Sequence, residues 1–180
     1  MQQILDSMIE APAYVRNGRL DVLAANQLGA ALYSEVLADP VQPPNVARFL
    51  FLSPRAPGFF SDWEQIASDA VAILRAEAGR DPYDRRLTDL IGELSTRSDE
   101  FRVRWAAHDV KHHRTGTKRL HHPVVGDLTL SYEALELPGD TGQRINVYTA
   151  EPGSPSAEAI RLLASWAATP RQVPDVVDER

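Results

Sequence analysis

Hydrophobic residues change their spacing along this chain, from a hairpin pattern to helical spacing and then to strict alternation. The first pattern is in "AYVRNGRLDVLAAN", where Asn17-Gly18 separates two apolar-rich runs. This dipeptide predicts a type I′ hairpin turn, because both of its central positions need positive φ. Asn26 then stands where an N-cap is expected, and the following helix places Leu28 and Leu32 on one face.

Helical spacing continues through the middle of the chain. After a Pro-rich break, "NVARFLFL" indicates a short apolar helix or turn. In "SDWEQIASDAVAILRAEAG", Ser61 and Glu64 form a capping-box pattern, and Gly79 is expected just beyond the helix end. Residues 81–82 start a further helix, and Ser98 starts another.

The period then falls to two residues, which is typical of strands. In "VKHHRTGTKRLHH" a turn is expected at Thr115-Gly116, and "GDLTLSYEALEL" places Leu128, Leu130 and Tyr132 on one side. "RINVYTA" gives a last strand, and an amphipathic helix follows "PGSPS". A hairpin, a helical excursion, a three-strand meander and a C-terminal helix predict an α+β, PAS-like antiparallel sheet with helices on one face and a cavity between the layers.

Length and composition limit the number of domains and the kinds of site that the chain can contain. The 180 residues predict one sensor domain at 11–168, with a linker or helix remnant at 1–10 and a flexible tail at 169–180. There is no cysteine, which excludes disulfides and thiolate metal sites. Neither a membrane span nor a signal peptide is recognisable, so we expect a cytoplasmic protein with no membrane partner. A net charge of −6 argues against binding of nucleic acid by the whole chain.

All five histidines lie between His108 and His122, among basic residues. His108 and His112 have the i, i+4 spacing of helical metal ligands. The period has changed by this point, however, and in a strand His112 and His113 point to opposite faces. A two-residue loop would place His112 diagonal to His121, and a three-residue loop would bring it beside His122. Because no HExxH motif and no GxSxG elbow is present, we expect no metal site, no catalytic residue and no enzyme activity.

A family resemblance adds to this reading. The segments "PAYVRNGRLDVLAAN", "RSDEFRVRW" with "HDV", "HPVVG" and "YTAEPGSPS" resemble the MmyB-like ligand-binding domain of actinobacterial transcription regulators, over about residues 9–167. The resemblance implies a PAS-like domain that follows a helix-turn-helix of the XRE type and accepts a fatty-acid-like ligand. Ala25 stands where the family usually has Trp. Too few residues precede the matched region for a helix-turn-helix, so we expect the DNA-binding domain to be absent from this chain.

We therefore expect a ligand-sensing domain of a bacterial transcription regulator, with a small apolar ligand held between sheet and helices. No cofactor is expected beyond a bound fatty acid or similar lipid, and DNA would be contacted only through the missing helix-turn-helix. The alternative is a dimerisation or partner-binding domain with a packed core, so a homodimer is also considered. Arg102 and Arg104 are the candidates for the ligand head group. The candidate ligand-binding residues are Phe49, Phe51, Val71, Leu74, Phe101, Trp105, His108, Leu130, Tyr132 and Val147.

Overall fold

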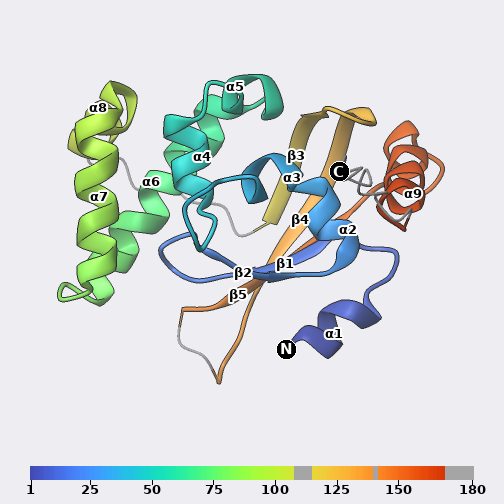
Figure 1. Ribbon diagram of the computed structural model, residues 1–180, viewed down its shortest axis with the longest axis horizontal. Coiled ribbons are helices and arrows are strands. Elements are labelled where there is room, and N and C mark those ends of the chain that lie inside the picture. The colour runs from blue at the N-terminus through green and yellow to red at the C-terminus, as the bar shows by residue number, and fades with distance from the viewer. Residues whose placement is uncertain (108–114, 140–141, 169–180) are drawn as a thin grey trace, which may run out of the picture.

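The computed structural model describes residues 1–107, 115–139 and 142–168, which form a five-stranded antiparallel sheet surrounded by helices (Figure 1). The order of hairpin, helices, meander and final helix confirms the predicted α+β, PAS-like fold class. The elements are α1 (Gln2–Ser7), β1 (Ala13–Arg16), β2 (Val22–Ala25), α2 (Gln27–Leu32), α3 (Ser34–Leu37), α4 (Val46–Leu52), α5 (Ala56–Phe59), α6 (Trp63–Arg80), α7 (Arg85–Arg97), α8 (Asp99–Ala106), β3 (Thr115–His122), β4 (Gly126–Glu136), β5 (Arg144–Thr149) and α9 (Pro155–Ala168).

The last strand in the sequence lies at the centre of the sheet. The strand order is β2-β1-β5-β4-β3, so β5 joins the N-terminal hairpin to the C-terminal meander. Tyr14 of β1 lies opposite Asn146 of β5, and Tyr132 of β4 lies opposite Tyr148 of β5. Because directly paired residues share a face of the sheet, these four side chains project toward the same side.

The first hairpin is confirmed, but its loop differs from the prediction. The connection runs from Asn17 to Asp21 and is not a two-residue turn. The side-chain oxygen of Asn17 accepts hydrogen bonds from the backbone N–H groups of Arg19 and Asp21, each at 3.0 Å. The positive φ falls on Leu20, at 68°, and not on Gly18. Asn17 therefore organises a wider loop through its side chain, as Asn often does in turns.

Two of the predicted helix starts are confirmed. The Asn26 side chain accepts a hydrogen bond from the Gly29 N–H at 2.7 Å and caps α2. Ser98 caps α8 in the same way, through the Phe101 N–H at 3.1 Å. Asn26 also donates to the carbonyls of Met8 and Ala11, at 2.7 and 2.8 Å. One buried amide thus fastens the segment between α1 and β1 to the start of α2.

Three other boundaries are corrected. The Ser61 N–H donates to the Arg119 carbonyl of β3 at 3.1 Å, and α6 begins two residues later, at Trp63. Gly79 lies inside α6, which continues to Arg80. Residues 81–82 do not start the next helix, because the cap of α7 is Asp84, whose carboxylate accepts from two backbone N–H groups.

The expected turn at Thr115-Gly116 is wrong. Both residues belong to β3, which pairs with β4 from Thr115 opposite Glu133 to His122 opposite Gly126. The chain reverses instead at residues 123–125, after which Gly126 takes a φ of 74°. The threonines on either side of Gly116 favour a strand, and this preference outweighs the tendency of Gly116 to form a turn. The two loop alternatives for His112 lie outside the described residues.

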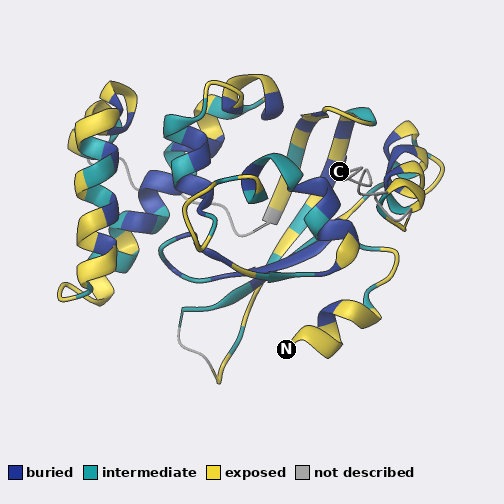
Figure 2. Cartoon of the chain, viewed as in Figure 1, coloured by how far each residue is buried: buried dark blue, intermediate teal, exposed yellow. Residues whose placement is uncertain are grey.

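Two apolar clusters lie on opposite faces of the sheet. The larger cluster joins the strands to helices α2 through α9, of which α6, α7 and α8 form a group at one end and α9 packs on α2 and β4 (Figure 1). The smaller cluster forms where Leu5 of α1 packs on Ala13, Val15 and Ile145. The predicted placement of helices on one face therefore holds except for α1, which is mostly exposed (Figure 2). Among the described residues, no helix is long and apolar enough to cross a membrane.

Candidate ligand cavity between sheet and helices

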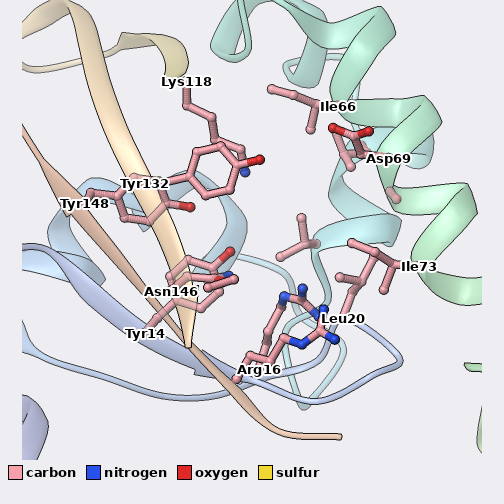
Figure 3. Close-up of a pocket in the computed structure, with 15 residues that line it drawn as sticks. Tyr14, Arg16, Leu20, Ile66, Asp69, Ile73, Lys118, Tyr132, Asn146 and Tyr148 are labelled. Carbon is pink, nitrogen blue, oxygen red and sulfur yellow. The ribbon is translucent and has the colours of Figure 1, made fainter. Parts of the chain in front are cut away.

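A cavity of about 60 Å³ lies between the sheet and helices α4 and α6 (Figure 3). Its apolar wall comes from the β1–β2 loop and the two helices, and its polar wall from the sheet. The lining residues are Tyr14, Arg16, Leu20, Val46, Leu50, Ile66, Asp69, Ala70, Ile73, Lys118, Tyr132, Ala134, Arg144, Asn146 and Tyr148. The cavity therefore combines an apolar side with a polar, cationic side.

Two periodicities place these residues together. Alternation along a strand puts Tyr14 and Arg16 of β1 on the cavity face, as it does Asn146 and Tyr148 of β5. On α6, the residues that face the cavity are spaced by three and four positions, and they are Ile66, Asp69, Ala70 and Ile73. The site is thus built on regular elements, which hold their side chains in fixed directions.

Tyrosines form the floor of the cavity. The hydroxyls of Tyr33 and Tyr148 are 2.6 Å apart and share a hydrogen bond, and both residues are almost completely buried. The Tyr14 ring lies 4.7 Å from the Tyr33 ring, between centroids. Burial raises the pKa of Tyr33 and of Tyr148 well above the usual range. Burial also acts to raise the pKa of Tyr14, but Lys118 and Arg16, together with hydrogen bonds, lower it overall.

Two cations on the sheet project into this tyrosine-rich face. Arg16 is only 5% exposed and donates a hydrogen bond to the Asn17 carbonyl at 3.2 Å. The Lys118 ammonium lies 5.2 Å from the Tyr132 ring centroid and 5.9 Å from that of Tyr148. Burial lowers the pKa of both cations. Among the described residues, no carboxylate forms an ion pair with either of them.

Of the predicted ligand-binding residues, Tyr132 lines this cavity. Val71, Leu74 and Leu130 are buried in the larger core cluster. Val147 lies on the opposite face, beside the cluster around Leu5. Ligand contact at these positions stays a prediction.

The remaining aromatic candidates pack away from the cavity lining. Phe51, Phe101 and Trp105 form a contiguous stack, in which Phe101 lies 5.0 Å from the Phe51 ring centroid and 5.6 Å from that of Trp105. Phe49 contacts the ring of Phe59 and also lines a separate surface hollow. These residues join α4 and α5 to α8, and their role in ligand binding also stays a prediction.

The predicted head-group arginines lie on α8. Arg102 is exposed and pairs with Asp99 at 2.8 Å. Arg104 donates to the Ser68 hydroxyl at 2.7 Å and to Glu100 at 2.8 Å. His108 lies outside the described residues.

Sequence reasoning did not select Tyr14, Arg16, Lys118 or Tyr148. The alternation in "AYVR" and "INVYT" could have placed the tyrosines and Arg16 on one face. Lys118 was not predicted because a turn was expected at Thr115-Gly116. Without a strand through these residues, there was no register to show that the Lys118 side chain points into the domain.

The described histidines occupy separate environments. His122 is 1% exposed, accepts from the Val124 N–H at 3.2 Å and donates to the Ala31 carbonyl at 3.1 Å. His121 is exposed and pairs with Asp127 at 2.6 Å. Within the described parts of the chain, no group of three potential metal ligands comes together. His122 therefore has a structural explanation that needs no ligand.

A comparison with protein families matches residues 1–163 to the MmyB-like transcription regulator ligand binding domain. The match includes α1, all five strands and most of α9, and therefore the whole cavity lining. No curated protein matches the chain.

Proposed function

The chain belongs to the family of MmyB-like transcription regulator ligand-binding domains, and we propose that it senses a small amphipathic ligand in the cavity between the sheet and helices α4 and α6. The ligand is fatty-acid-like, with an apolar tail and a polar head. Its occupancy would be transmitted to a helix-turn-helix that binds DNA in the cytoplasm of a bacterial cell. This chain performs the sensing step and catalyses no reaction.

The single observation that carries this proposal is the two-sided lining of the cavity. Leu20, Leu50 and Ile66 offer an apolar surface, and the sheet opposite offers tyrosine hydroxyls and cations. A ligand site of this kind is typically apolar with a few placed polar groups. A tail of about ten methylenes would contribute roughly 8 kcal/mol of burial, part of which association entropy removes.

The small volume of the cavity suggests how binding would be transmitted. Sites for drug-sized ligands usually enclose about 300–1,000 Å³, whereas this cavity has about 60 Å³. An acyl chain would therefore have to move the apolar wall away from the sheet. Because α6 also contacts α7 and α8, its displacement would reach the outer helices.

The direct test is mass spectrometry of the purified protein, first native and then after denaturation and organic extraction. We expect an added mass that extracts as a fatty acid or a similar lipid, or else a rise in melting temperature when acyl carboxylates are added. Ala70→Leu, which adds bulk at the cavity wall, should reduce this rise. Ala76→Leu, at an exposed position of the same helix, is the matched control.

A second candidate is a dimerisation or partner-binding domain without a small-molecule ligand. The observation that favours it is the same small volume, because a nearly filled interior needs no occupant. A protein that carries no added mass, and that no acyl compound stabilises, would support this candidate and contradict the sensor.

A further inference from the structure

Helix α6 borders the cavity on one side and contacts helix α8 on another. Ser68 and Arg75 are the positions of α6 that hydrogen-bond to α8. Because an α-helix has 3.6 residues per turn, residues two positions apart, such as Ile73 and Arg75, point to nearly opposite sides. The cavity-facing positions of α6 are Ile66, Asp69, Ala70 and Ile73. A displacement of α6 at the cavity would therefore act directly on α8.

Two arginines join α6 to α8, one from each helix. Arg75 of α6 donates to the Trp105 carbonyl, and its guanidinium carbon lies 4.8 Å from the centroid of the Trp105 ring. Arg104 of α8 donates to the Ser68 hydroxyl at 2.7 Å and lies 5.4 Å from the centroid of the Trp63 ring. Each helix thus holds the other through a hydrogen bond and a cation–π contact. We call Arg75, Arg104, Trp63 and Trp105 the arginine–tryptophan clasp.

The clasp is also connected to α4, the second helix of the cavity wall. The Trp63 indole donates to the Leu50 carbonyl at 3.0 Å, and Leu50 lines the cavity. The Phe51 ring of α4 contacts the rings of Trp63 and Phe101, with centroids 6.3 and 5.0 Å apart. Phe101 in turn stacks on Trp105. These rings form one packed chain from the cavity wall to α8, and a close-packed interior transmits displacement.

Favourable and unfavourable contacts are balanced in the clasp. The Nε atoms of Arg75 and Arg104 are both buried and have no hydrogen-bond partner among the described residues. A buried donor without a partner is unfavourable, whereas the indole rings favour the same two guanidinium groups. A separation of α6 from α8 would break the ring contacts but would hydrate both Nε–H groups. A small displacement of α6 can therefore change the population of the closed clasp.

We propose that the arginine–tryptophan clasp transmits occupancy of the cavity to α8. A ligand that displaces α6 opens the clasp and lowers the stability of the last turn of α8. The proposal rests on the proposed function and specifies how the site is linked to the rest of a regulator. Arg75 and Arg104 are positioning residues, since the cavity lining includes neither of them. The exposed side of α8, at Arg102 and Val103, would carry the ligand-dependent change.

The test adds bulk to the cavity wall and measures the response of α8, so that it needs no ligand. Ala70→Leu adds bulk from α6, and Ala134→Leu adds it from β4. Both are made in the full chain with Trp166→Phe, which leaves the two clasp tryptophans out of three. We expect each to speed amide hydrogen exchange in α8 at least about threefold and to increase acrylamide quenching of the clasp tryptophans. Ala76→Leu, at an exposed position of α6, should change neither.

Substitutions of Arg75 test whether the response passes through the clasp. Arg75→Met should speed exchange in α8 by itself, and Ala70→Leu should then add less than about 1.5-fold, because the clasp is already open. Arg75→Lys keeps the charge without the guanidinium fork, and it should retain part of the response to Ala70→Leu. Arg102→Met is the matched control, because Arg102 is exposed and pairs with Asp99 of the same helix at 2.8 Å. It should leave the response unchanged.

Two results would overturn the proposal. In the first, Ala70→Leu and Ala134→Leu speed exchange in α6 and leave α8 unchanged. In the second, the effects of Arg75→Met and Ala70→Leu on α8 simply multiply, as expected for independent structural roles. A urea titration confirms that each variant is folded, and either of the two cavity variants carries the test if the other does not fold.

Ligand binding separates this proposal from the proposed function. If added acyl carboxylates raise the melting temperature but leave exchange in α8 unchanged, the coupling is wrong and the sensor stands. If the cavity variants speed exchange in α8 while no acyl compound binds and no lipid is extracted, the sensor is wrong and the coupling stands.

Discussion

Strands β1 and β5 have two faces, and the side chains on these faces differ in polarity and charge. On one face Ala13, Val15 and Ile145 meet α1 through Leu5, and every group is apolar. On the other face the neighbouring positions are Tyr14, Arg16, Asn146 and Tyr148, which line the cavity although all four are buried. The residues of both faces are therefore buried, but their side chains differ in polarity and charge. A face that only had to pack would be expected to resemble the first one, so the polar face indicates a function.

The largest effect is expected on the apolar face, where Leu5 is completely buried. Leu5→Ala leaves a cavity between α1 and the sheet and should lower the free energy of unfolding by about 2–5 kcal/mol. Urea denaturation measures this, and the rise in melting temperature caused by added acyl carboxylates should stay the same. Ile4→Ala, at a mostly exposed position of the same helix, is the control and should change stability by less than about 0.5 kcal/mol. A loss of ligand affinity in Leu5→Ala would show that the two faces are not independent.

The next effect is expected on the cavity face, at the hydroxyl pair of Tyr33 and Tyr148. Tyr148→Phe removes the buried hydroxyl that shares a hydrogen bond with the Tyr33 hydroxyl, which should cost about 1–3 kcal/mol of stability. Tyr33→Phe should behave alike, and the double variant should be less destabilised than the sum of the two single variants. A double-mutant cycle in urea measures this coupling. Strict additivity would mean that the hydrogen bond contributes nothing.

A smaller effect should follow from pH, through His122. Burial lowers the pKa of His122, against the opposing effects of its hydrogen bond to the Ala31 carbonyl and of Glu35. The neutral ring is therefore favoured in the folded protein. Its contribution to stability is present above the unfolded pKa of about 6.5 and is lost as pH falls below that value.

Unfolding free energies measured between pH 8 and pH 5 test this expectation. His122→Asn should weaken the pH dependence, whereas His121→Asn, at an exposed position of the same strand, should leave it nearly unchanged. An unaltered pH profile in His122→Asn would contradict the assignment of a neutral, doubly hydrogen-bonded ring.

The smallest effect is expected at Glu133, which is exposed on β4 on the face that α1 occupies at β1 and β5. Glu133→Ala should change the free energy of unfolding by less than about 0.5 kcal/mol and leave the binding of acyl carboxylates intact. Thermal denaturation together with calorimetry checks both. A large loss would mean that the packed part of the outer face extends as far as β4.

Much of the fold was predictable because strand alternation and helix caps are local signals. Asn26 and Ser98 are read directly from the sequence, since each precedes an apolar helical pattern. The loop at Asn17 could not be read in the same way. Its form depends on hydrogen bonds from one side chain to two backbone groups, and the Asn-Gly pair alone favours a different turn.

The candidate site was less predictable because it depends on register between strands far apart in sequence. Tyr132 was selected from the alternation within β4 alone. Selecting Lys118 requires knowing that β3 extends through Thr115 and that Lys118 pairs with Leu130. The aromatic residues of α8 have the spacing of a ligand-facing stripe, but Trp105 instead stacks on Phe101 and lies under the Arg75 guanidinium.

The central place of β5 determines when the cavity can come into existence during synthesis. Arg16 and Arg144 are paired across nearly the length of the domain, so the contact closes most of the chain into one loop. Such closure is entropically costly and is slow in folding. Until the ribosome has released β5, the β1–β2 hairpin and the β3–β4 hairpin have no strand between them, and the tyrosine floor is incomplete. The tyrosine-rich cavity face is therefore completed only after β5 has been synthesised, later than the first hairpin and the helices that precede β5 in the chain.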